Sequence, residues 1–167
     1  MTTHRPQVFY SFHFDNDVFR VQQIRNIGVI EGNEPVSKND WETLRNTPSG
    51  IERWIDENMK YKTCVVVLIG SETVQRPWVR YEIAKGWDDG KGILGIYIHN
   101  LRDPQTAKTP PYYGRCAQGQ NPFEQVTLKN GTTIAKYVPC FNPNPSDAYV
   151  DIAQNLLRWV AQAAKRS

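Results

Sequence analysis

Runs of apolar residues predict four strands along the chain. Residues 63–70 (TCVVVLIG) form an unbroken apolar run rich in β-branched side chains, which is typical of a strand buried on both faces of a parallel sheet. Residues 7–14 (QVFYSFHF) and 92–100 (GILGIYIHN) are shorter candidates, rich in aromatic residues or isoleucine. A further short strand is expected within residues 134–141, whereas the polar residues 29–47 give no firm strand.

Four helices are predicted from apolar residues three and four positions apart. The first has Asp15 or Asp17 as its cap and Gly28 just beyond its end. The second has Ser49 as its candidate N-cap, and the third begins at Pro77. The last helix has an apolar face formed by Tyr149, Ile152, Ala153, Leu156, Val160 and Ala163.

Strands that alternate with helices indicate an α/β fold of three layers, in which helices cover both faces of a central parallel sheet through right-handed crossovers. The length indicates one domain over residues 1–167. Residues 101–145 are rich in proline, glycine and asparagine, and we expect local turns there because a structureless loop of that length is unusual. Ligands of such folds bind beyond the carboxyl ends of the strands.

Composition and charge exclude several classes of partner. The net charge is +3, and the basic residues are scattered rather than clustered, so we expect no nucleic-acid partner. No stretch approaches the roughly 18 apolar residues of a membrane-spanning helix, and no apolar leader follows the N-terminus, so we expect a soluble cytoplasmic protein.

The three cysteines are Cys64, Cys116 and Cys140, and their wide spacing fits a reducing compartment rather than a disulfide framework. A zinc site built from Cys116, Cys140 and a histidine lacks ligand-like spacing, and no metal is expected. The chain has no G-x-G-x-x-G, P-loop, G-x-S-x-G or H-E-x-x-H motif, which argues against the nucleotide sites and the hydrolases that depend on them.

The stretch QRPWVRYEIAKG (75–86) opens a helix directly after the most apolar strand. At about 100° per residue, the face that packs on the sheet consists of Val79, Ile83, Gly86 and Trp87. Trp78 and Glu82 then lie one turn apart on the flank of that face. We expect Gly86 to leave open space above the Glu82 carboxylate, so that a groove carries an acid at its edge.

Two interpretations of Glu82 follow from this position. An acid near a helix start contributes about 0.3–1 kcal/mol by itself, and Glu82 could also pair with Lys85. Alternatively Glu82 is catalytic, because the helix begins where ligands of a parallel sheet bind.

The chain resembles the TIR-like proteins of the bacterial Thoeris anti-phage systems, within the TIR superfamily. The resemblance covers roughly residues 7–125 and is carried by VFYSFHFDND, VVVLIGSETVQRPWVRYEI, GILGIYIHN and NPF, in this order. It implies a flavodoxin-like sheet and an enzyme that consumes NAD⁺ as its substrate, with no further cofactor and with Glu82 as the catalytic residue. It also implies a product, a cyclic or modified ADP-ribose, that activates a separate effector protein.

A carboxylate suits this reaction. Cleavage of the nicotinamide–ribose bond builds oxocarbenium-like positive charge on the ribose, which a nearby carboxylate stabilises. Nicotinamide leaves as a neutral molecule, so one glutamate suffices where ordinary glycoside hydrolysis uses two acids.

Candidate substrate-binding residues lie at the ends of the predicted strands and helices: Ser11, Phe12, His13, Ser71, Trp78 and Asn121. The rings of Phe12, Phe14 and Trp78 could stack on nicotinamide or adenine. Ser11 and His13 face the same way in a strand, and His13 could bind phosphate or ribose or be structural. Ser71 could face the site or cap the following loop, and Asn121 belongs to the NPF motif.

Two other functions stay open at this point. The chain could be a non-enzymatic TIR-like scaffold, with Arg80 and Tyr81 pointing away from the packed face and available for self-association into a homo-oligomer. It could also be a nucleoside or nucleotide N-glycosidase. Residues 29–47 lack the proline–glycine tip common in TIR domains, so the resemblance predicts no assembly geometry.

Overall fold

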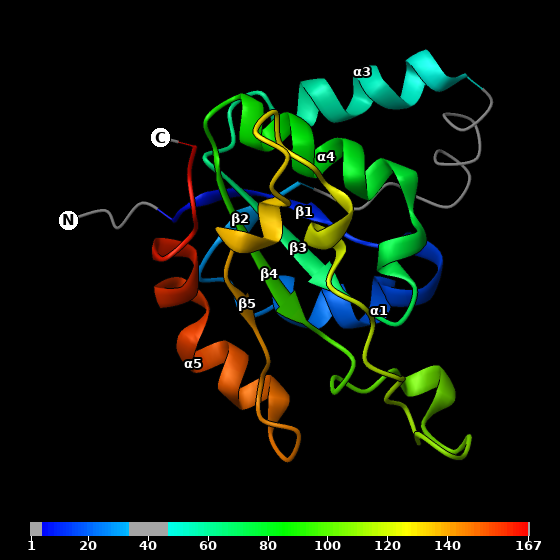
Figure 1. Ribbon diagram of the computed structural model, residues 1–167. Helices are drawn as coiled ribbons and strands as arrows, with labels where there is room; N and C mark the ends of the chain where they lie inside the picture. The colour runs from blue at the N-terminus through cyan, green and yellow to red at the C-terminus, as the bar shows by residue number, and fades with distance from the viewer. Residues whose placement is uncertain (1–4, 34–46, 167) are drawn as a thin grey trace.

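A five-stranded parallel sheet lies at the centre of the computed structural model, which describes residues 5–33 and 47–166. The strands are β1 (Gln7–Ser11), β2 (Glu31–Gly32), β3 (Cys64–Ile69), β4 (Gly92–Tyr97) and β5 (Cys140–Phe141). The α-helices are α1 (Phe14–Arg25), α3 (Pro48–Met59), α4 (Pro77–Asp88) and α5 (Ala148–Ala161). Short 3₁₀ helices are η1 (Thr73–Gln75), η2 (Pro104–Thr106), η3 (Pro122–Gln125) and η4 (Ile134–Lys136). Figure 1 shows the sheet between the helices.

The strand order is β2-β1-β3-β4-β5, and all four neighbouring pairs are parallel. This is the flavodoxin-like order, in which the chain reverses direction across the sheet between β1 and β3. The order confirms the predicted three-layer α/β fold with a central parallel sheet. It also places the end of β1 beside the end of β3, where the register pairs Ser11 with Val67.

Two separate cores hold the three layers together. On one face of the sheet, Val8, Val66 and Leu94 pack against α1 and α5. On the other face, Phe9, Val65 and Val67 pack against α3 and α4. Every residue of β3 is buried, as its unbroken apolar run predicted, because successive side chains enter opposite cores.

The structure corrects several local predictions. Helix α1 is capped by His13 rather than by Asp15 or Asp17, and α3 is capped by Thr47 rather than by Ser49. Tyr149 is exposed, and the buried face of α5 includes Ala148 and Trp159 instead.

The polar stretches also contain more structure than their composition indicated. Within residues 29–47, where no strand was firm, Glu31 and Gly32 form β2 through backbone pairing with β1; residues 34–46 lie outside the described residues. Three 3₁₀ helices and β5 occupy the predicted turn region 101–145. Of the strand expected within 134–141, only the last two residues pair with β4, and Ile134–Lys136 forms η4.

Candidate functional site

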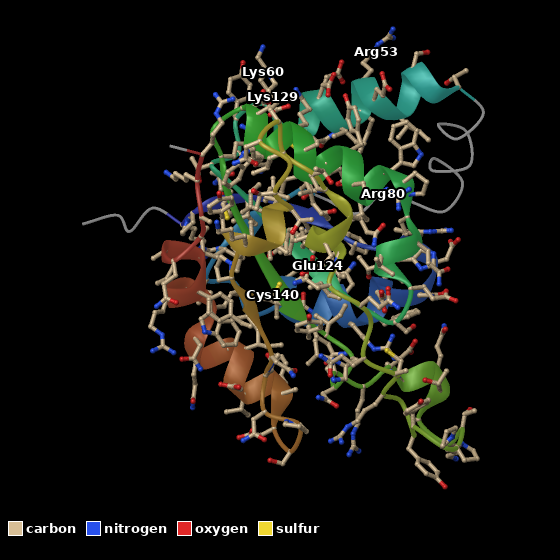
Figure 2. All side chains as sticks on the ribbon, viewed as in Figure 1. Arg53, Lys60, Arg80, Glu124, Lys129 and Cys140 are labelled. Carbon is tan, nitrogen blue, oxygen red and sulfur yellow. The ribbon has the colours of Figure 1, made fainter. Side chains whose placement is uncertain are left out.

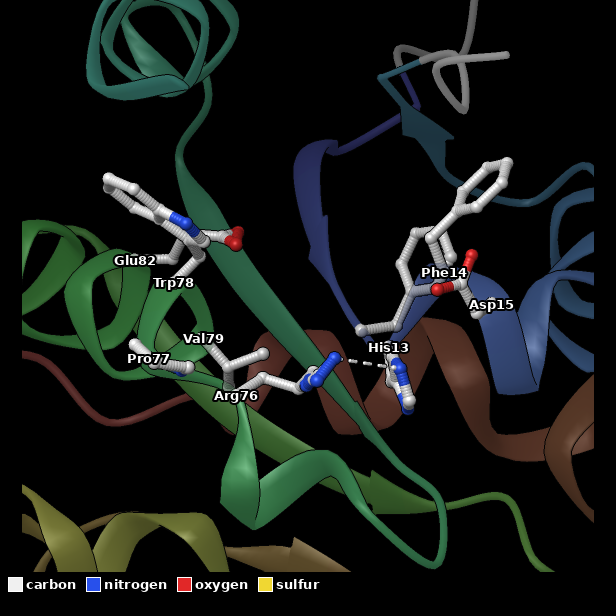
Figure 3. Close-up of a pocket in the computed structure, with 9 residues that line it drawn as sticks. His13, Phe14, Asp15, Arg76, Pro77, Trp78, Val79 and Glu82 are labelled. Atoms are coloured by element: carbon white, nitrogen blue, oxygen red, sulfur yellow. Dashed lines mark hydrogen bonds between the residues drawn. The ribbon is translucent and has the colours of Figure 1, made fainter. Parts of the chain in front are cut away.

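A pocket of about 210 Å³ opens between the end of β1 and the first two turns of α4. Its lining consists of Phe12, His13, Phe14, Asp15, Arg76, Pro77, Trp78, Val79 and Glu82. Figure 3 shows the two walls, with His13, Phe14 and Asp15 facing Arg76, Trp78 and Glu82. The pocket therefore lies at the carboxyl edge of the sheet, where ligands of parallel sheets bind.

Two abrupt chain turns create the pocket. Strand β1 ends at Ser11, and α1 begins only three residues later at Phe14, so the chain passes directly from strand to helix. On the other wall, Arg76 has an extended backbone and Pro77 starts α4. Proline restricts the residue before it to extended conformations and suits the first helical position, so the dipeptide sets the angle at which α4 leaves the loop.

Glu82 is the buried acid of this pocket. Only 7% of the residue is exposed, and no described lysine, arginine or histidine forms an ion pair with it. Burial raises the pKa of Glu82 well above its usual range, and the nearby Ser11 hydroxyl opposes this shift without reaching the geometry of a full hydrogen bond. The empty pocket thus favours the neutral carboxylic acid.

Gly86 does not leave the open space that was expected above Glu82. A Cβ atom at Gly86 would lie 2.6 Å from Cγ2 of Val65 and 3.0 Å from Cδ1 of Ile93. The prediction of open space above the carboxylate was therefore wrong. Gly86 instead lets α4 approach the sheet closely, and that approach draws Glu82 from the flank of the helix into a buried position.

His13 and Arg76 form the polar side of the pocket. Nη1 of Arg76 lies 3.2 Å from Nε2 of His13, and Nδ1 of His13 lies 3.9 Å from a carboxylate oxygen of Glu72. A guanidinium group can only donate, so Nε2 accepts and the ring proton is on Nδ1, which faces Glu72. The ring is therefore neutral while it bonds Arg76, and it holds the guanidinium group at the pocket.

Aromatic rings supply the rest of the lining. The rings of Phe12 and Phe14 are 6.3 Å apart on the β1 side. On the α4 side, Trp78 packs edge-on against Tyr81 at 5.7 Å. All three pocket rings are partly buried, so each presents a face or an edge toward a ligand.

The structure brings together most of the predicted site residues. Phe12, His13, Trp78 and Glu82 line one pocket, and Ser11 lies beside Glu82. Two others lie outside the lining. Ser71 contacts Cys116, and the Asn121 side chain accepts a hydrogen bond from the backbone N–H of Phe123 at 2.9 Å, where it caps η3.

Arg80 and Tyr81, considered for self-association, have partners within the chain. Nη1 of Arg80 donates to the carbonyl oxygen of Val74 at 3.2 Å, and the Tyr81 hydroxyl bonds Asp56 on α3 at 3.0 Å. Figure 2 shows Arg80 on the side of α4 that faces away from the sheet.

Sequence reasoning missed Arg76. The residue stands immediately before a proline that opens a helix, next to the most apolar strand, and this position was a usable signal. Its contact with His13 joins residues 63 positions apart, which only the strand order brings together.

A second buried acid, Asp17, lies at the same edge of the sheet. Its Oδ1 accepts from Nη1 of Arg20 at 3.1 Å, and both side chains are buried. Arg20 also donates to the carbonyl oxygens of Leu101 and Gly114, each at 2.9 Å. Burial raises the pKa of Asp17 to about 6, although Arg20 opposes the shift. This pair joins α1 to the loop after β4.

Metal binding finds no support among residues 5–33 and 47–166: no cluster of histidine, cysteine and acidic side chains there could hold an ion. The three cysteines are free thiols. Within the same ranges, every helix is too short or too polar to cross a membrane.

Comparison with known proteins gives two matches. The sequence model of the family described as "Thoeris protein ThsB, TIR-like domain" matches residues 9–103, which includes both walls of the pocket. The chain is also 34% identical over 127 residues to a protein of Bacillus cereus named "Putative cyclic ADP-D-ribose synthase ThsB1". That alignment covers 72% of this chain and 62% of the relative, so the chain spans less than two thirds of the length of the protein it matches.

Proposed function

Since the chain belongs to the family of Thoeris ThsB TIR-like domains, we propose that it is an NAD⁺-consuming enzyme of anti-phage defence. The enzyme cleaves the nicotinamide–ribose bond and releases a cyclic or modified ADP-ribose. The name of the Bacillus cereus relative, a cyclic ADP-D-ribose synthase, supports this product class. A separate effector protein then responds to the product.

The observation that carries the proposal is a buried glutamate without a cation. Glu82 has no cationic partner among the described residues, and burial disfavours its ionised form. NAD⁺ itself supplies the missing charge, because its nicotinamide ring is a cation. Binding of the substrate therefore favours the carboxylate form of Glu82.

The carboxylate then acts on the developing charge. As the bond to nicotinamide breaks, its electron pair moves to the ring nitrogen, the ring becomes neutral, and positive charge grows on the ribose. A fixed carboxylate in a water-poor pocket stabilises that charge far better than one in bulk water, because the protein need not reorganise.

The shape of the pocket fits the reacting part of the dinucleotide. Its volume of about 210 Å³ is below the roughly 300–1,000 Å³ of pockets that enclose a drug-sized ligand. It therefore accommodates the nicotinamide and its ribose, between the rings of Phe12, Phe14 and Trp78, and leaves the adenosine half toward the pocket mouth.

The test is turnover of NAD⁺ by purified protein, followed by mass spectrometry of the products, with and without lysate of phage-infected cells as a trigger. We expect Glu82→Gln to lower turnover by about 10²–10³-fold or more, because the amide removes the charge and keeps the shape. The matched control is Glu124→Gln, an exposed acid on η3 (Figure 2), which should leave turnover unchanged. Equal turnover by wild type and Glu82→Gln under every trigger would contradict the proposal and favour a non-enzymatic scaffold.

A further inference from the structure

Arg76 is a charged group of the pocket that the proposed reaction at Glu82 does not use. Its guanidinium group lines the pocket, and its one side-chain hydrogen bond among the described residues is to the neutral ring of His13. Its Nε–H is buried and has no partner there. No described acidic side chain forms an ion pair with it. Arg76 is partly buried, and a guanidinium group that meets only a neutral acceptor can still bind an anionic ligand.

The surroundings of Arg76 favour an anion. Arg76 caps α4, whose first turn lines the pocket and whose positive dipole end adds to the guanidinium charge. Two acids lie nearby. Asp15 is on the opposite wall and Glu72 lies beside His13, but both are exposed, so solvent screens them. Figure 3 shows Arg76 and Glu82 directed from α4 toward the same open space.

The spacing along α4 matches the chemistry of the substrate. Arg76 and Glu82 are six positions apart, which corresponds to about 9 Å along a helix. In NAD⁺ one ribose separates the bond that breaks from the diphosphate. A substrate whose nicotinamide–ribose bond lies at Glu82 therefore brings its diphosphate toward Arg76.

We propose that Arg76, positioned by His13, binds the diphosphate of the substrate and makes the pocket selective for phosphorylated nicotinamide nucleotides over nicotinamide riboside. The inference rests on the proposed function, because it assigns a specificity residue to the same reaction. Nicotinamide riboside contains the same scissile bond and the same ring cation but carries no phosphate. The two substrates therefore differ in the group that Arg76 would recognise.

The first experiment compares kcat/KM for NAD⁺ and for nicotinamide riboside. We expect Arg76→Gln to lower the value for NAD⁺ by about 10- to 100-fold, the effect of losing a hydrogen bond to a charged group, mostly through KM. The value for the riboside should stay within about twofold, since uniform damage to the pocket would lower both. Arg53→Gln, an exposed arginine on α3 (Figure 2), is the matched charge control and should change neither. An equal fall for both substrates, or no fall for NAD⁺, overturns the proposal.

His13 is tested as the positioning residue. Glutamine at this position keeps an oxygen that can accept from Arg76, whereas leucine does not. We expect His13→Leu to lose a large part of the preference for NAD⁺ over the riboside and His13→Gln to retain most of it. If both variants lose turnover of both substrates equally, His13 acts on the pocket as a whole and not through Arg76.

A binding measurement separates this inference from the proposed function. Titration calorimetry with ADP-ribose on Glu82→Gln protein, with and without Arg76→Gln, reports phosphate binding without any turnover. We expect the affinity to fall at least about tenfold when Arg76 is replaced, and the difference to shrink at high salt. Equal affinities overturn the role of Arg76. If wild-type protein turns over no NAD⁺, the proposed function fails. The titration alone then decides whether Arg76 binds the diphosphate. Circular dichroism and the Arg76→Lys variant, which keeps the charge without the fork, control for folding.

Discussion

Two buried carboxylates lie near the carboxyl ends of the same strands, and their surroundings differ. Asp17 has its own cation, Arg20, whose guanidinium group also bonds two backbone carbonyls. Glu82 has no cation among the described residues and faces a pocket instead. Burial raises the pKa of both acids. Asp17 has its counter-charge without a ligand, whereas Glu82 obtains one only when a positively charged group enters the pocket.

This comparison separates a structural acid from a functional one. Burial alone does not make the distinction, because Asp17 is even less exposed than Glu82. A perturbed pKa alone does not make it either, since ion-pair networks also perturb titration. What distinguishes Glu82 is the missing counter-charge together with the pocket that it lines.

The largest effect on stability is expected from Arg20→Met. The substitution leaves Asp17 buried without a cation and removes the bonds that join α1 to Leu101 and Gly114. Breaking a buried ion pair by removing one partner costs about 3–5 kcal/mol, so the free energy of unfolding should fall by that amount. Urea denaturation measures it.

The double variant Asp17→Asn/Arg20→Met controls for the charge. It leaves no charge buried and should recover part of the loss, because much of the cost of the single change is the uncompensated carboxylate. A loss below about 1 kcal/mol for Arg20→Met would mean that the pair does not hold the loop, and Asp17 would then need another explanation.

The sequence alone predicted only part of the contrast between the two acids. The apolar run of β3 and the periodicity after Pro77 fixed the sheet, the helix and the flank on which Glu82 lies. Asp17 was interpreted as a candidate cap of the first helix, because aspartate is preferred at that position. Its burial depends on the close approach of Gly70 and of the loop after β4, which local pattern does not encode.

The partner of Arg76 was beyond local reasoning for the same reason. His13 lies in the connection from β1 to α1, and Arg76 lies in the connection from β3 to α4. Only the pairing of β1 with β3 brings Nε2 of His13 within 3.2 Å of Nη1 of Arg76. Strand β2 was missed because its two residues, Glu31 and Gly32, pair through the backbone and carry no apolar signal. Sequence patterns indicate which side chains are buried. They do not indicate which strands and loops lie side by side, and these contacts depend on that arrangement.

A smaller loss of stability is expected from Gly70→Ala, which tests how tightly the structural acid is enclosed. A Cβ atom at this position would lie 2.1 Å from Oδ2 of Asp17, a side chain that its bond to Arg20 keeps from moving away. Overpacking of this kind costs about 1–3 kcal/mol. The same substitution in an Asp17→Ala background should cost clearly less, and equal costs in the two backgrounds would place the strain elsewhere. Thermal unfolding of the four proteins measures the coupling.

The smallest effect is expected from the functional acid, and it has the opposite sign. The folded-state pKa of Glu82 is raised, so between its ordinary pKa and the folded value the native protein binds more protons than the unfolded chain. Stability therefore falls as pH rises through that window, by linkage. Glu82→Gln removes this loss, because an amide does not titrate. The variant should match wild type most closely near pH 4 and melt at a higher temperature at pH 8, while its turnover of NAD⁺ falls by about 10²–10³-fold or more. A stabilised but inactive variant is the expected signature of a site that lacks its own counter-charge.

If Glu82→Gln lowers the melting temperature at pH 8 as Arg20→Met does, Glu82 belongs with Asp17 among the structural acids, and the comparison between them no longer holds.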